Sequence, residues 1–234
     1  MKILYIFPHP DDESFGPAPA MAAQKRLGHQ VHLLTLTKGE ATKQRFRLKV
    51  DKEEMGEIRF KEMQCVENVL ELDSMTVTDL PDSDLKNLDP REIEKVIVDK
   101  IHELKPDVIV TYAVHGISGF EDHLVSHAVV KRLFCEMRDQ FDYPKRLALF
   151  TRMGEVHIDG KFRLSVSKDE EINCVEQCSD EDMEKFHRAL DCYETYQQVI
   201  EDSQVKEVTT KEVPFEFFQE DPAKRVHDIF AELE

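Results

Sequence analysis

The feature that most constrains this 234-residue chain is the alternation of short apolar runs with longer stretches of helical character. Two runs near the N-terminus, residues 2–7 and 31–37, are almost continuous in β-forming residues, and the stretch between them can begin a helix at Pro17 and end it near Gly28. Residues 107–113 form another such run. Near-continuous apolar strands separated by helices predict a mostly parallel sheet covered by helices on both faces, which is a doubly wound, Rossmann-like α/β fold.

The rest of the chain divides into a continuation of this pattern and a different C-terminal part. Helices are expected at residues 52–72, 89–104 and 123–138, and strands at residues 76–80 and 147–152. Residues 156–158 and 162–166 flank Asp159-Gly160, a hairpin signal. Helices at residues 180–199 and 222–233, with extended chain at residues 205–218, complete the expectation. We therefore expect a single domain of residues 1–234, with an α/β core at 1–150 and an accessory hairpin and helix layer at 151–234.

The net charge limits the partners. Lysine and arginine total 31 and aspartate and glutamate total 48, so the formal net charge is −17 at pH 7. A charge of this sign opposes binding to nucleic acid or anionic lipid. The N-terminal apolar run is too short for a signal-peptide core, and no run approaches the length of a membrane span. We expect a cytoplasmic protein with a small-molecule partner, no nucleic acid and no membrane.

The cysteines point to the same compartment. The chain has five, Cys65, Cys135, Cys174, Cys178 and Cys192, and no pair has the CxxC spacing. An odd number without paired spacing is more typical of reduced thiols in a cytosolic protein than of a disulfide framework. Cys174 and Cys178 form a CxxxC pair, but structural zinc needs four ligands and no second pair is available. We therefore expect reduced thiols.

Two polar clusters follow predicted strands, where ligands bind in open parallel sheets. Residues 9–13 hold one imidazole and three carboxylates, whose mutual repulsion favours a bound cation. His9 and Asp12 can point the same way, and His123 from the loop after residues 107–113 would complete the three ligands and open water position of catalytic zinc. Asp11 is then the candidate general base.

Other interpretations of these residues stay open. Asp11, Asp12 and Glu13 could cap the following helix, because acids stabilise helix N-termini. His123 taken alone could be a surface or capping histidine. Two histidines and one carboxylate also make the facial triad of non-haem iron oxygenases, but those usually sit on a β-barrel and the α/β alternation counts against them.

The segment His9-Pro10-Asp11-Asp12-Glu13 resembles the (P/A)HPDDE motif of the LmbE-like, or PIG-L, family of zinc-dependent N-acetylglucosamine deacetylases. Residues 34–40 (LTLTKGE) resemble its T-x-GE segment, residues 59–62 (RFKE) its R-x-x-E helix, and residues 119–123 (GFEDH) its G-H-x-D-H segment. The resemblance implies a metal-dependent N-deacetylase with zinc, or iron, held by His9, Asp12 and His123, and with Asp11 as general base.

The resemblance also assigns substrate contacts, and it contains one departure. Arg59 matches a position that contacts the anionic or sugar part of the substrate in relatives, and Glu40 is a second candidate for substrate binding. The family commonly has a histidine three residues before its last ligand, which stabilises the oxyanion or protonates the leaving amine, and this chain has Phe120 there. His115, from the same loop, is the candidate to supply that imidazole.

Within the family, the phrase HGISGF-x-DH is most similar to the bacillithiol-biosynthesis deacetylases, whose substrate is N-acetylglucosaminyl-malate. This similarity implies a small anionic amino-sugar conjugate as substrate, with Arg59 as a carboxylate partner, and a homo-oligomer. Two alternatives stay open. One is a deacetylase of another N-acetylated glycoside, and the other is a non-catalytic sugar-binding protein on the same fold, which Phe120 makes credible.

Overall fold

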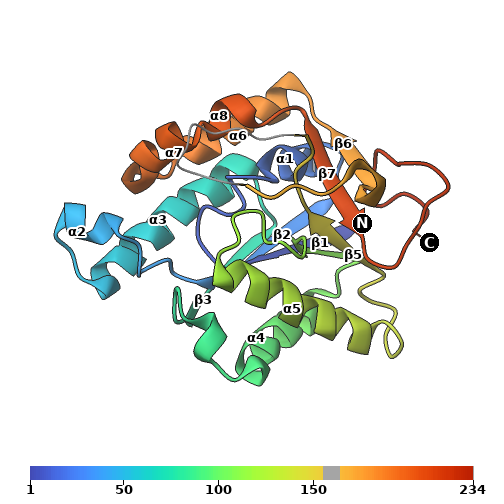
Figure 1. Cartoon of the computed structure of the whole chain (residues 1–234), viewed down its shortest axis with the longest axis horizontal. Coiled ribbons are helices and arrows are strands. Elements are labelled where there is room, and N and C mark those ends of the chain that lie inside the picture. The colour runs from blue at the N-terminus through green and yellow to red at the C-terminus, as the bar shows by residue number, and fades with distance from the viewer. Residues whose placement is uncertain (155–163, 234) are drawn as a thin grey trace.

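A seven-stranded sheet forms the centre of the molecule (Figure 1). The structure is a computed structural model that describes residues 1–154 and 164–233. The strand order is β3-β2-β1-β4-β5-β7-β6. The strands are β1 (Lys2–Phe7), β2 (Gln30–Thr37), β3 (Ser74–Leu80), β4 (Val108–Tyr112), β5 (Arg146–Phe150), β6 (Cys174–Gln177) and β7 (Glu212–Phe217).

The first five strands run parallel, while β7 pairs antiparallel with β5 and β6 pairs antiparallel with β7. The chain moves outward from β1 to β3 and then returns to β4 on the other side of β1. The carboxyl ends of β1 and β4 therefore flank the point at which the strand order reverses, where open α/β sheets bind ligands. The predicted mostly parallel α/β fold is confirmed.

Helices cover both faces of the sheet (Figure 1). They are α1 (Ala18–Arg26), α2 (Gln44–Leu48), α3 (Lys52–Leu70), α4 (Pro90–Leu104), α5 (Glu121–Met137), α6 (Asp180–Asp191), α7 (Gln197–Ser203) and α8 (Val205–Val208), with 3-10 turns η1 (Leu85–Asn87), η2 (Asp169–Glu171) and η3 (Glu194–Tyr196). Helices α1, α3 and α6 pack on one face, and α4 and α5 on the other. Within the described residues no helix has the length and apolar character needed to cross a bilayer.

The pattern of β1 explains the two cores. Ile3, Tyr5 and Phe7 join the core under α1, α3 and α6, whereas Leu4 and Ile6 join the core under α4 and α5. Successive side chains of a strand point to opposite faces, so a strand covered on both sides must be apolar throughout. Continuous rather than alternating hydrophobicity was therefore the correct signal for this sheet.

The C-terminal part departs from expectation in three places. The helix expected at residues 180–199 is broken, because α6 ends at Asp191 and α7 begins at Gln197. The extended segment expected at residues 205–218 begins with the helix α8 and becomes a strand only at β7. Residues 222–233 form no helix, because Val226 instead exchanges backbone hydrogen bonds with Val175 and Asn173 along the edge strand β6.

Two further predictions concern the C-terminal hairpin and the cysteines. The Asp159-Gly160 turn and the first strand of the expected hairpin lie outside the described residues, and residues 164–166 of its second strand are not in a strand. The expectation of reduced thiols is wrong for one pair, because Cys65 and Cys192 form a disulfide, with Cα atoms 5.7 Å apart. Their separation of 127 residues leaves no spacing signal in the sequence, and only the packing of α3 against α6 brings them together. Cys174 and Cys178 are buried free thiols.

Candidate metal centre and its support

The segment between β1 and α1 is a series of turns that carries His9 and Asp12. The backbone N–H of His9 donates a hydrogen bond of 2.8 Å to Asp12 Oδ2, which holds the carboxylate beside the imidazole. His9 Nδ1 lies 3.5 Å from the same oxygen. The interpretation of the three acids as helix caps is wrong, because α1 begins only at Ala18 and has no acid in its first turn.

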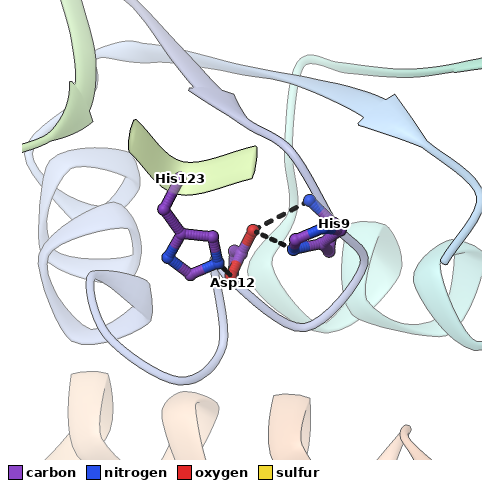
Figure 2. Close-up of side chains that lie close together, drawn as sticks. All are labelled: His9, Asp12 and His123. Carbon is purple, nitrogen blue, oxygen red and sulfur yellow. Dashed lines mark hydrogen bonds and ion pairs between the residues drawn. The ribbon is translucent and has the colours of Figure 1, made fainter. Parts of the chain in front are cut away.

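His123 is the third residue of α5, and its ring faces Asp12 (Figure 2). Its Nε2 lies 3.2 Å from Asp12 Oδ1. Its Nδ1 lies 2.9 Å from the carbonyl oxygen of Gly116, and donation to that carbonyl leaves the Nε2 lone pair for a metal. The ring stacks on Tyr112 at a centroid distance of 4.3 Å, and the Tyr112 hydroxyl donates a 2.7 Å hydrogen bond to Asp12 Oδ1.

Two more carboxylates lie against the other ring nitrogen of His9. Nε2 is 3.1 Å from Asp122 Oδ2 and 3.3 Å from Asp82 Oδ1. Donation from Nε2 to a carboxylate orients Nδ1 towards a metal. Burial alone would lower the pKa of His9, but hydrogen bonds with Asp12 and Asp122 outweigh it and raise this pKa to about 10. Asp122 itself is held by the backbone N–H groups of Ser83 and Leu85.

The donor atoms fit a divalent metal. One nitrogen each from His9 and His123 and one oxygen from Asp12 lie within 4.8 Å of one another. In the parts of the chain that the structure describes, the other group close enough for a metal is His9 with Asp82 and Asp122, and neither group includes a cysteine. Burial would raise the pKa of Asp12, yet His123 and His9 hold it well below its usual range, so the carboxylate is ionised. Two nitrogens and one carboxylate suit catalytic zinc and also iron.

Asp11, between these ligands in sequence, is held mainly by α3. Arg59 Nη2 donates hydrogen bonds of 2.8 Å to Asp11 Oδ2 and 2.6 Å to the carbonyl of Pro10. The φ of Asp11 is 87°, a left-handed conformation that is costly for a residue with a side chain and persists only where its surroundings impose it. Burial raises the pKa of Asp11 to about 6, although Arg59 acts to lower it.

Arg59 is buried, with 1% of its surface exposed. Its guanidinium carbon lies 3.8 Å from the centroid of the Tyr196 ring and 5.1 Å from that of Tyr193. Among the residues that the structure describes, its Nε and Nη1 have no hydrogen-bond partner. The structure thus gives Arg59 a role in supporting Asp11 through a cation-π contact and an ion pair, and the substrate contact expected of it stays a prediction.

Tyr193 joins Asp11 to Glu13. Its hydroxyl donates a 2.6 Å hydrogen bond to Glu13 Oε1 and accepts one of 2.8 Å from the backbone N–H of Asp11. Burial raises the pKa of Glu13 to about 7. Sequence reasoning missed Tyr193, which is 180 residues from Glu13 and has no motif around it. It also missed Tyr112 and Asp122, whose signals were their places at the end of a strand and beside His123.

The remaining predicted residues contact other groups. His115 Nε2 is 3.2 Å from Ser167 Oγ, and its Nδ1 accepts a 3.0 Å hydrogen bond from the Ile117 N–H. Glu40 accepts a 3.1 Å hydrogen bond from the N–H of Asp82 and lines a cavity of about 230 Å³. The catalytic role of His115 and the substrate role of Glu40 stay predictions. Phe120, in the position of the family histidine, is 61% exposed, and its ring meets that of His123 edge-on at 5.6 Å.

Comparison with known proteins identifies a family and several similar proteins. Residues 4–134 match the family described as PIG-L: GlcNAc-PI de-N-acetylase. The 1D-myo-inositol 2-acetamido-2-deoxy-alpha-D-glucopyranoside deacetylase of Thermomonospora curvata is 31% identical over 159 residues, covering 56% of this chain and 51% of the relative. The probable N-acetyl-alpha-D-glucosaminyl L-malate deacetylase 2 of Bacillus anthracis is 30% identical over 118 residues, covering 48% and 52%. The chain thus spans about half the length of these curated relatives.

Among solved structures, a deacetylase triple mutant from the teicoplanin biosynthetic pathway aligns with a TM-score of 0.70. The alignment covers 95% of this chain and 100% of the other at 17% sequence identity. Identity at this level shows a shared fold and nothing about the substrate.

Proposed function

The chain belongs to the PIG-L family of GlcNAc-PI de-N-acetylases, and from that premise we propose that it hydrolyses the acetamide of an N-acetylglucosamine conjugate at a metal held by His9, Asp12 and His123. The observation that carries the proposal is the convergence of these three side chains at the edge of the sheet where β1 and β4 end. The outer contacts support it, because Gly116 and Asp122 leave one nitrogen of each imidazole directed at the common centre.

The proposed reaction breaks the amide C–N bond with water and yields acetate and a free amine. A divalent metal bound by the three ligands would polarise the acetamide carbonyl and lower the pKa of the attacking water. Asp11 accepts a proton from that water and returns it to the leaving nitrogen. A pKa of about 6 suits this role, because the carboxylate is mostly ionised at neutral pH and yet basic enough to take a proton. Arg59 and Tyr193 hold Asp11 in place.

We propose zinc as the metal, with iron as the alternative that the same ligands permit. For the substrate we propose N-acetylglucosaminyl-malate. The conjugates named for the relatives share N-acetylated glucosamine and differ in the attached group, which is inositol in one and malate in the other. The choice of malate as the attached group rests on the HGISGF-x-DH segment.

Compartment and assembly are proposals as well. We propose a cytoplasmic homo-oligomer, as the sequence leads us to expect. The cysteines no longer support a cytoplasmic location, because the Cys65–Cys192 disulfide is unusual in a reducing compartment. The composition and the acidic charge still favour a small-molecule partner.

The test combines metal analysis with amine release. Protein purified without chelator is analysed for metal and assayed on N-acetylglucosaminyl-malate, on the inositol conjugate and on N-acetylglucosamine. We expect about one metal ion per chain and amine release that is fastest with the malate conjugate. Metal-loaded protein that releases no amine from any of the three would contradict the proposal and support a sugar-binding protein, whereas preference for the inositol conjugate would contradict only the choice of malate.

A further inference from the structure

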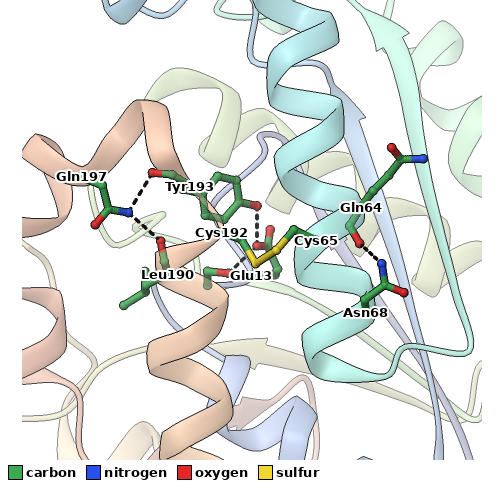
Figure 3. Close-up of a disulfide and its surroundings, with 9 residues drawn as sticks. Glu13, Gln64, Cys65, Asn68, Leu190, Cys192, Tyr193 and Gln197 are labelled. Atoms are coloured by element: carbon green, nitrogen blue, oxygen red, sulfur yellow. Dashed lines mark hydrogen bonds between the residues drawn. A yellow bond between two sulfur atoms is a disulfide. The ribbon is translucent and has the colours of Figure 1, made fainter.

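The disulfide between Cys65 and Cys192 lies beside Tyr193, whose hydroxyl reaches Glu13 (Figure 3). Cys65 belongs to α3, which also carries Arg59. Cys192 comes immediately after α6 and immediately before Tyr193. The bond therefore ties the helix that supports Asp11 to the segment that supports both Asp11 and Glu13.

Residues 192–196, which we call the support segment, contact the site through three side chains. Tyr193 bonds Glu13 and the N–H of Asp11. The N–H and Oγ1 of Thr195 donate hydrogen bonds of 2.7 and 2.9 Å to the carboxylate of Glu62, which lies one turn from Cys65 on α3. The ring of Tyr196 covers the guanidinium of Arg59. The contacts of Thr195 and Tyr196 are with α3, and those of Tyr193 are with the turn at residues 9–13, so the support segment must stay packed against both.

The support segment has little regular structure of its own. Helix α6 ends at Asp191, and the segment continues as the short 3-10 turn η3. A segment with few internal backbone hydrogen bonds depends on outside contacts for its order. Among these outside contacts the disulfide is covalent, and it fixes the end of the support segment next to Tyr193.

We propose that the Cys65–Cys192 disulfide is a redox-modification site, at which a small thiol opens the bond, loosens the support segment and lowers turnover while the metal ligands stay in place. The part concerning turnover rests on the proposed deacetylase function. The part concerning order in the support segment and in the turn at residues 9–13 does not.

The bond is reachable from the surface. Cys65 is exposed, and both cysteines line a surface cavity of about 570 Å³ beside α3 and α6. A thiolate attacks the sulfur of Cys65 and displaces Cys192 as a thiolate, which takes up a proton. A second molecule of the thiol then attacks the mixed disulfide. The net change is two cysteine thiols gained and one disulfide of the small thiol formed, so two electrons pass from the small thiol to the protein.

The other cysteines do not compete with this site. Cys174 and Cys178 are buried, and burial raises the pKa of both thiols, so neither presents a thiolate at neutral pH. Cys135 is an exposed free thiol on α5 with no contact in this support, which makes it the matched control.

The experiment compares oxidised protein, protein treated with a phosphine reductant that does not chelate metal, and the variants Cys65→Ser and Cys135→Ser. Thiol titration should give three thiols in the oxidised chain and five in the reduced one, from five cysteines and one disulfide. Amide hydrogen exchange is followed in peptides covering residues 9–13 and 192–196. Metal content and the rate of amine release are measured on the same samples.

We expect faster exchange in both peptides and about tenfold slower amine release after reduction and in Cys65→Ser, with metal content unchanged. Cys135→Ser should match the oxidised wild type and still respond to the reductant, whereas Cys65→Ser should no longer respond. Equal exchange in oxidised and reduced protein would overturn the proposal, as would a five-thiol count before reduction. If no sample releases amine, the deacetylase function fails, and the exchange data still decide whether the disulfide orders the turn.

Discussion

The turn at residues 9–13 presents two sets of side chains that are built in different ways. His9 and Asp12 meet His123, which follows the neighbouring strand. These three proposed ligands, which we call the metal set, therefore come from two adjacent strand ends. Asp11 and Glu13 are held by Arg59 and Tyr193, which come from a helix packed on the sheet and from the C-terminal third. The comparison teaches that the positions of the proposed ligands follow from local motif and sheet topology, whereas the positions of the candidate base and its neighbour depend on distant packing.

The largest expected effect is loss of the metal set. His123→Ala removes one of the three proposed ligands, so we expect loss of bound metal and a fall in amine release of about 10³-fold or more, because activation of the water is lost with the metal. Metal analysis and initial rates measure both. The matched control is His187→Ala on the exposed side of α6, which should change neither. Full metal occupancy in His123→Ala would remove that residue from the ligand set.

The second effect separates the two sets. Asp11→Asn keeps the size of the side chain and removes its basicity, so we expect turnover to fall by about 10²–10⁴-fold with metal content unchanged. The measurement is the initial rate of amine release at saturating substrate, alongside metal analysis. Asp139→Asn, at an exposed position, is the control. Unchanged turnover in Asp11→Asn would show that another group takes the proton.

A smaller effect on turnover is expected at Tyr193, which supports Asp11 and Glu13. Tyr193→Phe leaves Glu13 Oε1 and the N–H of Asp11 without this partner, so we expect a loss of about 1–3 kcal/mol in the free energy of unfolding, since buried polar groups become unpaired. Turnover should fall by about tenfold without loss of metal. Urea unfolding and kinetics measure the two effects, with Tyr143→Phe as control. A fall in metal content equal to the fall in turnover would erase the distinction between the two sets.

The smallest effect on turnover is expected outside both sets, at a group that makes stability depend on pH. Burial raises the pKa of Glu176 from 4.5 to about 8, and its oxygens accept hydrogen bonds from Gln24 and from the N–H of Ile229. A folded-state pKa above the unfolded value stabilises the fold fully below about pH 4.5, and this stabilisation is lost as the pH rises through 8. Urea unfolding between pH 6 and 9 should show that Glu176→Gln lacks this loss, whereas the exposed Glu184→Gln keeps it. Identical pH profiles in Glu176→Gln and wild type would exclude Glu176 as the cause.

The sequence allowed most of the sheet to be predicted, for a physical reason visible in β1. Strands buried on both faces are apolar at every position, and such runs stand out from amphipathic helices without knowledge of the fold. The edge strand β6 carried no such signal, because only one of its sides is paired with β7 and its sequence includes Glu176 and Gln177. The expected helix at residues 222–233 failed for a related reason, since the backbone of Val226 is drawn to the open edge of β6.

The candidate ligands were predictable and their support was not. His9, Asp12 and His123 lie immediately after strands or at a helix start, so strand order alone brings them to one edge. Tyr193 reaches this turn, and Cys192 reaches Cys65, only through the packing of α6 on α1 and α3. Contacts between residues more than a hundred positions apart, without a repeated spacing, leave no periodicity for a single sequence to reveal.

The covalent link between Cys65 and Cys192 also determines how the molecule responds to a cut in its backbone. A protease that cleaves once anywhere between the two cysteines leaves fragments that remain joined by the disulfide. The N-terminal fragment would keep His9 and Asp12, and for a cut beyond α5 it would keep His123 as well. Nicked protein should therefore migrate as one band on a non-reducing gel and as two bands after reduction. Its two fragments should remain together during purification.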